Sequence, residues 1–145
     1  MIPNHPPHFA IIGAGTAGLA TAILLARQNI QVSILEKASE LEPVGAGLLL
    51  QPSGLAVFEH LGLLDEVLRL GAKVTGLKGQ LPSGNLLVNS HYQQAHPDFY
   101  GVGIHRATLC HVLENKCREY SELITWQMNT DIQTLEETSN QVRVL

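Results

Sequence analysis

Three glycines and one glutamate are the residues of this sequence whose types and spacing could hold an anionic ligand. Gly13, Gly15 and Gly18 have the spacing G-x-G-x-x-G, and Glu36 follows the third glycine by 18 residues. Gly13 permits a tight turn, Gly15 lets a diphosphate approach the backbone, and Gly18 lets a helix pack close to a sheet. The N–H groups and the positive end of the helix dipole would face the anion. Glu36 could accept hydrogen bonds from both ribose hydroxyls of an adenosine.

The segments around these residues predict the elements that such a site needs. Apolar residues over 9–12 predict a strand, the nearly all-apolar segment 16–28 predicts a buried helix that Asn29 ends, and 30–35 predicts a second buried strand. Strand, glycine turn, helix and strand, closed by an acid, together predict a dinucleotide site. A tight strand–helix turn without a ligand would explain the glycines but not the position of Glu36.

Length and composition exclude several classes of protein. A chain of 145 residues with 45% hydrophobic residues predicts one globular domain, and no apolar run reaches the roughly 20 residues of a membrane span. The net charge of −4 gives no case for a nucleic-acid partner. Cys110 and Cys117 would share one helix face, which predicts reduced packing residues in a cytoplasmic protein and no metal site. Residues 1–8 are expected to be a disordered tail rather than a signal peptide.

Beyond the second strand the sequence predicts a loop and two short helices. The segment 39–53 contains a proline and a Gly-Ala-Gly before an apolar triplet, which predicts a long loop whose backbone passes close to something flat. Two helices follow, each ended by a glycine: 54–61, with Ser53 as its cap, and 63–70.

The remaining segments predict mixed structure. Residues 73–79 and 86–90 flank a turn with proline and glycine, which predicts a β-hairpin, and 93–99 predicts a loop. The other expected elements are a helix over 107–119, a third parallel strand over 123–126, and the start of a meander at 133–137 and 141–145.

Arg106 is an unusual residue at the expected start of a helix. The helix dipole disfavours a cation there by a few tenths to about 1 kcal/mol. A nearby anion such as a diphosphate would reverse that penalty. An ion pair with a surface acid such as Asp98 is the alternative.

Four motifs give this sequence a resemblance to a known family. They are Gly-Ala-Gly-Thr-Ala-Gly at 13–18, Ile-Leu-Glu-Lys at 34–37, Gly-Ala-Gly-Leu at 45–48 and Leu-Gly-Leu-Leu at 61–64. In order and spacing they resemble the N-terminal portion of the FAD-dependent aromatic hydroxylases, the single-component flavoprotein monooxygenases typified by p-hydroxybenzoate and salicylate hydroxylases. The resemblance implies an α/β fold, with a Rossmann-like FAD-binding βαβ domain and parallel sheet over 9–72 and 100–145. It assigns 73–99 to a hairpin and loop of an incomplete second, substrate-binding domain.

The same resemblance implies the cofactor-binding residues. It places Glu36 at the adenosine ribose with Lys37 beside it, the segment 45–47 near the flavin ring, and the backbone of Met128 at the adenine. Arg106, in the motif Arg-Ala-Thr-Leu, matches a family arginine that contacts FAD. The implied set is Gly13, Ala14, Gly15, Thr16, Ala17, Gly18, Glu36, Lys37, Gly45, Ala46, Gly47, Arg106 and Met128.

In the family that this sequence resembles, the flavin carries the chemistry. NAD(P)H reduces it, and the reduced flavin activates O2 to hydroxylate a small, usually aromatic substrate. The family's later Asp-Gly and Gly-Asp elements are absent from these 145 residues. We therefore expect the FAD-binding N-terminal portion of a flavoprotein monooxygenase, an oxidoreductase that is not active as this chain alone and for which a homo-oligomer is left open. The alternatives are a non-catalytic FAD- or nucleotide-binding module and an NAD-dependent dehydrogenase.

Overall fold

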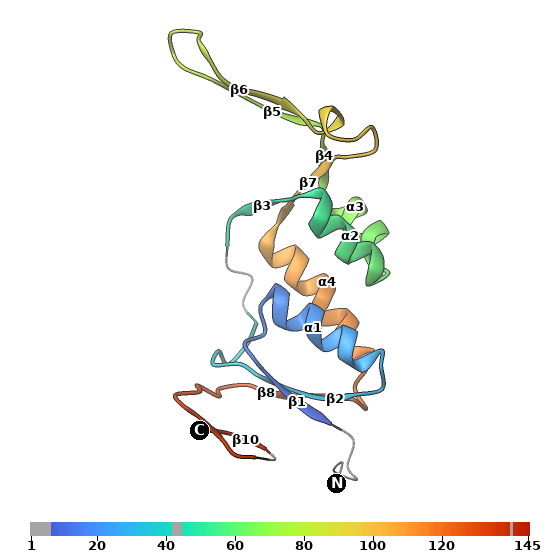
Figure 1. Cartoon of the computed structure of the whole chain (residues 1–145), viewed down its shortest axis with the longest axis vertical. Helices are drawn as coiled ribbons and strands as arrows, with labels where there is room; N and C mark the ends of the chain where they lie inside the picture. The colour runs from blue at the N-terminus through green and yellow to red at the C-terminus, as the bar shows by residue number, and fades with distance from the viewer. Residues whose placement is uncertain (1–6, 42–44, 140) are drawn as a thin grey trace. The chain divides into compact units, whose positions relative to one another are not determined.

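The structure is a computed structural model of the chain, and it describes residues 7–41, 45–139 and 141–145 (Figure 1). The chain divides into two compact units, residues 1–42 with 113–145 and residues 43–112. These boundaries differ from the predicted domain boundaries at 72/73 and 99/100. The predicted boundaries describe the domains of a complete enzyme, and they stay a prediction. None of the helices in the described ranges is long and apolar enough to cross a membrane.

The first unit is built on a parallel three-stranded sheet with the strand order β1-β2-β8. Helix α1 connects β1 to β2 and lies across one face of this sheet (Figure 1). The predicted βαβ unit and its third parallel strand are therefore confirmed. The bounds are β1 His8–Ile12, α1 Thr16–Ala26, β2 Gln31–Leu35 and β8 Ile124–Gln127.

The core of this unit follows from the apolar character of α1 and β2. Leu19 and Ile23 of α1 and Val32 and Ile34 of β2 are fully buried. The helix ends at Ala26, two residues before the predicted end, because Asn29 adopts a left-handed φ of 59° and donates its N–H to the Ala26 carbonyl.

Strand β1 begins at His8, inside the segment predicted to be a tail. His8 Nε2 lies 2.9 Å from Ser33 Oγ, and Ser33 Oγ lies 2.9 Å from Thr125 Oγ1. This chain of side-chain hydrogen bonds crosses all three strands and ties the first residue of β1 to the sheet. Residues 1–6 of the predicted tail lie outside the described residues.

The predicted meander is present as a short antiparallel pair, β9 Leu135–Glu137 and β10 Val142–Val144. Residue 140, in its predicted turn, lies outside the described residues. Helix α4, Arg106–Arg118, begins in the second unit and ends in the first. In the first unit its Cys117 is buried, and the thiol lies 3.5 Å from the Leu19 carbonyl oxygen.

The second unit contains an antiparallel sheet with the order β3-β7-β4, accompanied by helices α2 and α3. The prediction of a loop over all of 39–53 is wrong, because β3 forms within it. Its partner β7 lies about fifty residues later in the chain, so no local pattern announces the pairing; residues 42–44 lie outside the described residues. The bounds are β3 Gly47–Leu50, α2 Pro52–His60, α3 Leu64–Leu70, β4 Ala72–Val74 and β7 Gly101–His105.

Helix α2 starts earlier than predicted, and Ser53 is not its cap. Gln51 occupies the N-cap position and Pro52 the first helical position, where a fixed φ and a missing N–H are harmless. Gly62 ends the helix with a φ of 66°, as expected. A Cβ on Gly71 would lie 2.4 Å from Val102 Cγ1, so glycine there lets the end of α3 approach β7.

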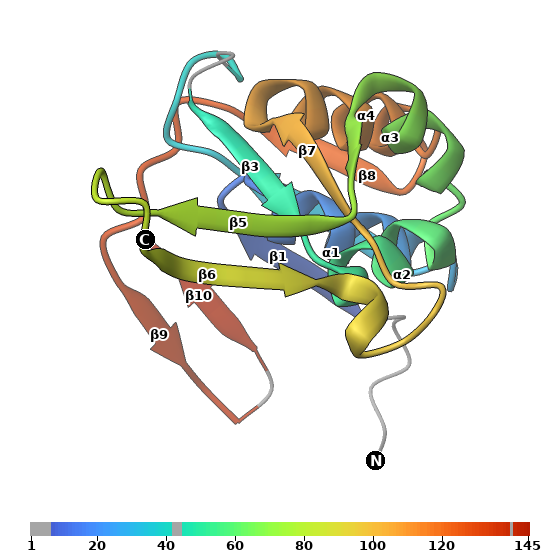
Figure 2. The same cartoon turned by 90° about the horizontal axis from the view of Figure 1, so that it is seen from above.

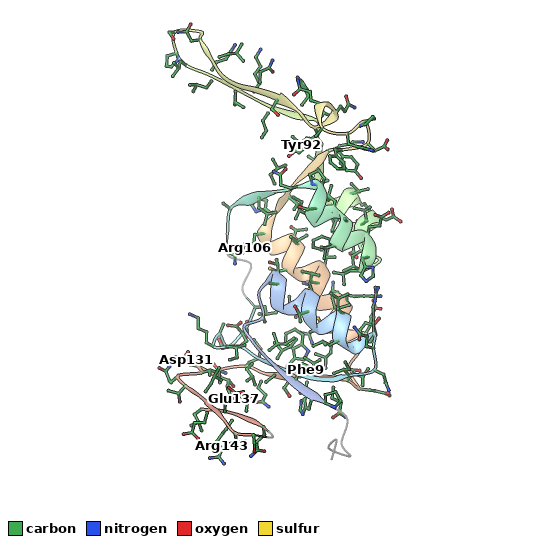
Figure 3. The ribbon with its side chains drawn as sticks, in the orientation of Figure 1. Phe9, Tyr92, Arg106, Asp131, Glu137 and Arg143 are labelled. Carbon is green, nitrogen blue, oxygen red and sulfur yellow. The ribbon has the colours of Figure 1, made fainter. Side chains whose placement is uncertain are left out.

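The predicted hairpin is present, but its first arm is divided between two sheets. Ala72–Val74 forms β4 and pairs with β7, whereas β5 Gly76–Gln80 pairs with β6 Leu86–His91. Figure 2 shows β5 and β6 as adjacent antiparallel arrows. The one-turn 3₁₀ helix Tyr92–Gln94 follows β6, and the Tyr92 hydroxyl donates a hydrogen bond of 2.8 Å to Gln51 Oε1. Figure 3 shows Tyr92 at the base of the hairpin.

Candidate functional site

The fold itself requires two of the three motif glycines in the turn between β1 and α1. Gly13 has a φ of +94°, which L side chains rarely adopt, and its N–H donates to the Leu35 carbonyl oxygen at 2.7 Å. A Cβ on Gly18 would lie 2.1 Å from the Gly13 carbonyl oxygen and 3.2 Å from Ile11 Cγ2. These two glycines are therefore accounted for by backbone conformation and by the contact between helix and strand.

Gly15 differs from the other two because nothing in the described chain requires glycine there. Its φ of −73° and ψ of 178° are open to any residue, and a Cβ on it would meet no atom within 4 Å. Space is therefore left open at the point where the backbone N–H groups of the first helical turn begin. This vacancy favours a ligand-binding loop over a plain strand–helix turn.

Glu36 lies half-buried just after β2 and contacts the glycine loop. Its Oε2 accepts a hydrogen bond of 2.7 Å from the Ala14 N–H, and its Oε1 accepts one of 3.0 Å from the Ala38 N–H. The Ala14 bond, and then the Ala38 bond, lower the pKa of Glu36 below its ordinary value; partial burial opposes this shift, and the charge of Lys37 adds to it. Glu36 is therefore a carboxylate at neutral pH.

The carboxyl ends of β2 and β8 meet beside Glu36. The Glu36 N–H donates to the Gln127 carbonyl oxygen at 2.9 Å, and the Asn129 N–H donates to that of Ala38 at 3.0 Å. Met128 lies between these bonded residues. The structure thus brings the glycine loop, Glu36 and Met128 to the same edge of one parallel sheet, where ligands of such folds bind.

Next to this edge is a cleft of about 410 Å³ within the first unit. The Arg118 guanidinium lies 5.7 Å from the centre of the Trp126 ring, and its Nε donates to Glu114 Oε1 at 3.2 Å. Sequence reasoning missed Trp126. It lies two residues before Met128, and in an extended strand this spacing places two side chains on the same face. The cleft is lined by Ser39, Glu40, Leu41, Glu114, Arg118, Trp126 and Met128.

The other predicted residues form a second group, within the second unit. Gly45 has a φ of +140°, and a Cβ on it would lie 3.2 Å from Arg106 Cδ. The Arg106 N–H points to the Ala46 carbonyl oxygen at 3.4 Å, and Gly47 pairs with His105 at the start of β3. The side chain of Arg106, at the start of α4 (Figure 3), therefore lies against the backbone of Gly45, where the positive φ favours glycine and a Cβ would crowd the arginine.

The structure does not pair Arg106 with Asp98, the acid named in the ion-pair alternative. Asp98 is turned to His96: its N–H donates to His96 Nδ1 at 3.3 Å, and its carboxylate lies 3.9 Å from the same nitrogen. Within the described ranges no acidic side chain pairs with Arg106. The cation at this helix start thus lacks a described protein counter-charge, which favours an anionic ligand.

The family of the chain follows from comparison with known proteins. Residues 8–144 match the family described as "FAD binding domain". The chain belongs to this family. Its cofactor is therefore FAD, and the resemblance to FAD-dependent aromatic hydroxylases is confirmed. The family assignment favours a flavoprotein over an NAD-dependent dehydrogenase.

Relatives of this FAD-binding domain are hydroxylases of similar sequence. The chain is 32% identical over 139 residues to the 3-hydroxybenzoate 6-hydroxylase of Klebsiella oxytoca, covering 92% of the chain and 34% of the relative. It is 33% identical over 136 residues to the phenazine 1,6-dicarboxylic acid hydroxylase PhzS of Lysobacter antibioticus, covering 92% and 33%. The chain thus spans about a third of the length of these curated relatives.

Solved structures give the same fold. PqsL of Pseudomonas aeruginosa, in complex with 2-aminobenzoylacetate, matches with a TM-score of 0.82 and 27% identity, over 97% of this chain and 39% of PqsL. The p-nitrophenol 4-monooxygenase PnpA of Pseudomonas putida matches with a TM-score of 0.85 over 96% of this chain and 35% of PnpA, and at 18% identity it supports the fold alone. The chain is an FAD-binding domain of the type found in flavoprotein monooxygenases.

Proposed function

We propose that this chain holds FAD in a NAD(P)H-dependent monooxygenase that hydroxylates a small aromatic substrate. The observation that carries the proposal is the open space at Gly15 beside the ionised Glu36, in a chain that belongs to an FAD-binding family. The names of the relatives, a hydroxybenzoate hydroxylase and a phenazine dicarboxylic acid hydroxylase, support the aromatic substrate class.

The first group of residues would hold the adenosine and diphosphate of FAD. Backbone N–H groups over 15–18 would bind phosphate oxygens, because the α1 N-terminus offers unpaired donors and a positive dipole end. Glu36 would accept hydrogen bonds from ribose hydroxyls, with Lys37 beside it. Met128 would contact the adenine through its backbone, in line with its place on the wall of the cleft.

The second group would also contribute to FAD binding. Arg106 would supply a positive charge for the cofactor, held in place by the backbone of 45–47 against its side chain. An arginine that pairs with phosphate through several N–H groups gives both charge and direction to the contact.

These roles assign the redox chemistry to FAD and the binding of FAD to the chain. When bound, FAD supplies the redox chemistry, taking electrons from NAD(P)H and reacting with O2. The described residues bind and orient the adenosine end, and none of them is assigned a catalytic role. That this chain is not active by itself stays a prediction, and the non-catalytic FAD-binding module stays the alternative.

The test is a binding measurement on the purified 145-residue chain. We expect FAD to remain bound through desalting, with a flavin absorption spectrum shifted from that of free FAD, and NAD⁺ in excess not to displace it. Colourless protein after desalting, together with saturable NAD⁺ binding, would reject the proposal in favour of a dehydrogenase-type site.

A further inference from the structure

Glu36 has a second set of partners besides the ligand proposed for it. Its two carboxylate oxygens accept hydrogen bonds from two backbone N–H groups, that of Ala14 at 2.7 Å and that of Ala38 at 3.0 Å. Ala14 is the middle residue of the glycine turn and lies 22 positions before Glu36. The carboxylate therefore bridges the glycine turn and the segment that follows β2.

We propose that Glu36 is a positioning residue that sets the conformation of the glycine turn in the ligand-free chain, in addition to binding ribose. The bridge itself rests on the two hydrogen bonds to Ala14 and Ala38 and not on the proposed function. Only its consequence for FAD, a turn already shaped for the diphosphate, rests on that function.

Two backbone hydrogen bonds hold the glycines on either side of Ala14: the Gly13 N–H donates to the Leu35 carbonyl oxygen at 2.7 Å, and the Leu19 N–H donates to the Gly15 carbonyl oxygen at 2.9 Å. A Cβ added to Gly13 or Gly15 would meet no atom within 4 Å, so no side chain packs against these two residues from that side. Ala14 itself is 4% exposed, and a buried N–H group without an acceptor is strongly unfavourable. The Glu36 carboxylate is the acceptor that the described structure gives to this N–H.

One carboxylate can serve both roles at once. Its two oxygens have about four acceptor positions, so two backbone N–H groups leave capacity for ribose hydroxyls. A glutamine in its place has a single acceptor oxygen and cannot hold both Ala14 and Ala38 in this arrangement. Glu36→Gln therefore removes at least one half of the bridge while keeping the length of the side chain.

The bridge should also depend on pH. Because its backbone partners lower the pKa of Glu36, the bridge is present above the ordinary glutamate value of 4.5 and is lost as the pH falls through the lower folded-state value. Lys37 is the charged side chain that acts on Glu36, and it favours the ionised form.

The experiment is amide hydrogen exchange of the FAD-free chain, followed by NMR at Ala14. We expect Glu36→Gln to speed exchange at Ala14 by about tenfold or more, as the loss of one charge-assisted hydrogen bond predicts. Glu122→Gln, at an exposed acid of the same unit, is the matched control and should change nothing at Ala14. Protection of Ala14 in the unmodified chain should fall at acidic pH, and this step should vanish in Glu36→Gln.

The outcomes separate this inference from the proposed function. Two results together would overturn the positioning role, even if Glu36→Gln weakens FAD binding. They are an Ala14 exchange rate that Glu36→Gln leaves unchanged, and Ala14 protection in the unmodified chain that does not fall at acidic pH. Faster exchange with unchanged FAD affinity would keep the positioning role and reject the ribose contact. Should Glu36→Gln not fold, the pH dependence of Ala14 protection in the unmodified chain still decides the question.

Discussion

Two glycines of one motif occupy chemically opposite environments. A Cβ on Gly15 would enter open space, whereas a Cβ on Gly18 would lie 2.1 Å from a backbone oxygen. The same substitution therefore separates a residue kept free for a ligand from one needed by the fold. Glu36 combines both properties, since it binds the turn and is proposed to bind the ribose.

We predict that Gly15→Ala and Gly18→Ala have opposite effects. Gly15→Ala should leave the thermal unfolding of the FAD-free chain unchanged but weaken FAD binding, because the methyl group takes space that the diphosphate needs. Gly18→Ala should destabilise the chain with or without FAD, by about 1–3 kcal/mol or more, because backbone must move. Calorimetry of the free chains and FAD titration measure both; a Gly15→Ala chain with normal FAD affinity would refute the role given to Gly15.

At the scale of elements, the ends of secondary structure carry the candidate site. The carboxyl ends of β2 and β8 lie together because parallel pairing aligns them, and they bring Glu36 beside Met128. The start of α4 carries Arg106, a cation at the end of the helix that favours anions.

Arg106→Ala should weaken FAD binding, and the loss should shrink as salt is raised, because salt screens charge interactions at partly exposed sites. The FAD-free chain should lose little stability, because no described acid pairs with Arg106. Arg69→Ala, which removes an exposed cation in a surface pair with Glu66, is the control and should not alter FAD affinity. A variant with normal FAD affinity but lower stability would return Arg106 to a purely structural role.

The single tryptophan gives a direct report on the cleft. Trp126 is the only tryptophan in the sequence and lines the cleft with Met128. Binding of ADP, which carries the adenosine and diphosphate without a flavin, should therefore change Trp126 fluorescence in a saturable way. Inorganic pyrophosphate, which lacks the adenine, is the control ligand. Saturable ADP binding without any fluorescence change would place the adenine away from this cleft.

At the scale of the whole molecule, the chain is an FAD-binding domain. It spans about a third of the length of its curated relatives. Within the second unit the β5–β6 hairpin exposes apolar side chains along much of its length, with Leu87 67% exposed. Cofactor binding is thus the property that this chain can be tested for as it stands.

FAD should raise the unfolding temperature of the chain, and NAD⁺ should not. A ligand that binds only the folded state adds about 2.7 kcal/mol of stability when its concentration is 100 times its dissociation constant. Scanning calorimetry at several FAD concentrations would show the increase growing with ligand. A shift with NAD⁺ equal to that with FAD would contradict the assignment of a flavin site.

The elements around the glycine motif could be predicted because their signals are local. The apolar run of α1, the β-branched residues of β2 and the left-handed Asn29 all act within a few residues of themselves. Errors occurred where the deciding contact is distant. Leu48–Leu50 looked like loop because its partner strand β7 lies far along the chain, and Ser53 looked like a cap although Pro52 had already begun the helix.

The sequence by itself determined the βαβ unit, the glycine turn and the acid that follows it, because spacing and hydrophobic pattern act over short distances. Only the tertiary structure decided what each of these residues touches. It showed that space is open at Gly15 and closed at Gly18, that Glu36 holds Ala14, and that Trp126 and Arg118 line a cleft beside Met128. The bond from Ala14 to Glu36 and the place of Met128 beside Glu36 join positions far apart in the chain, because the parallel strands align their ends.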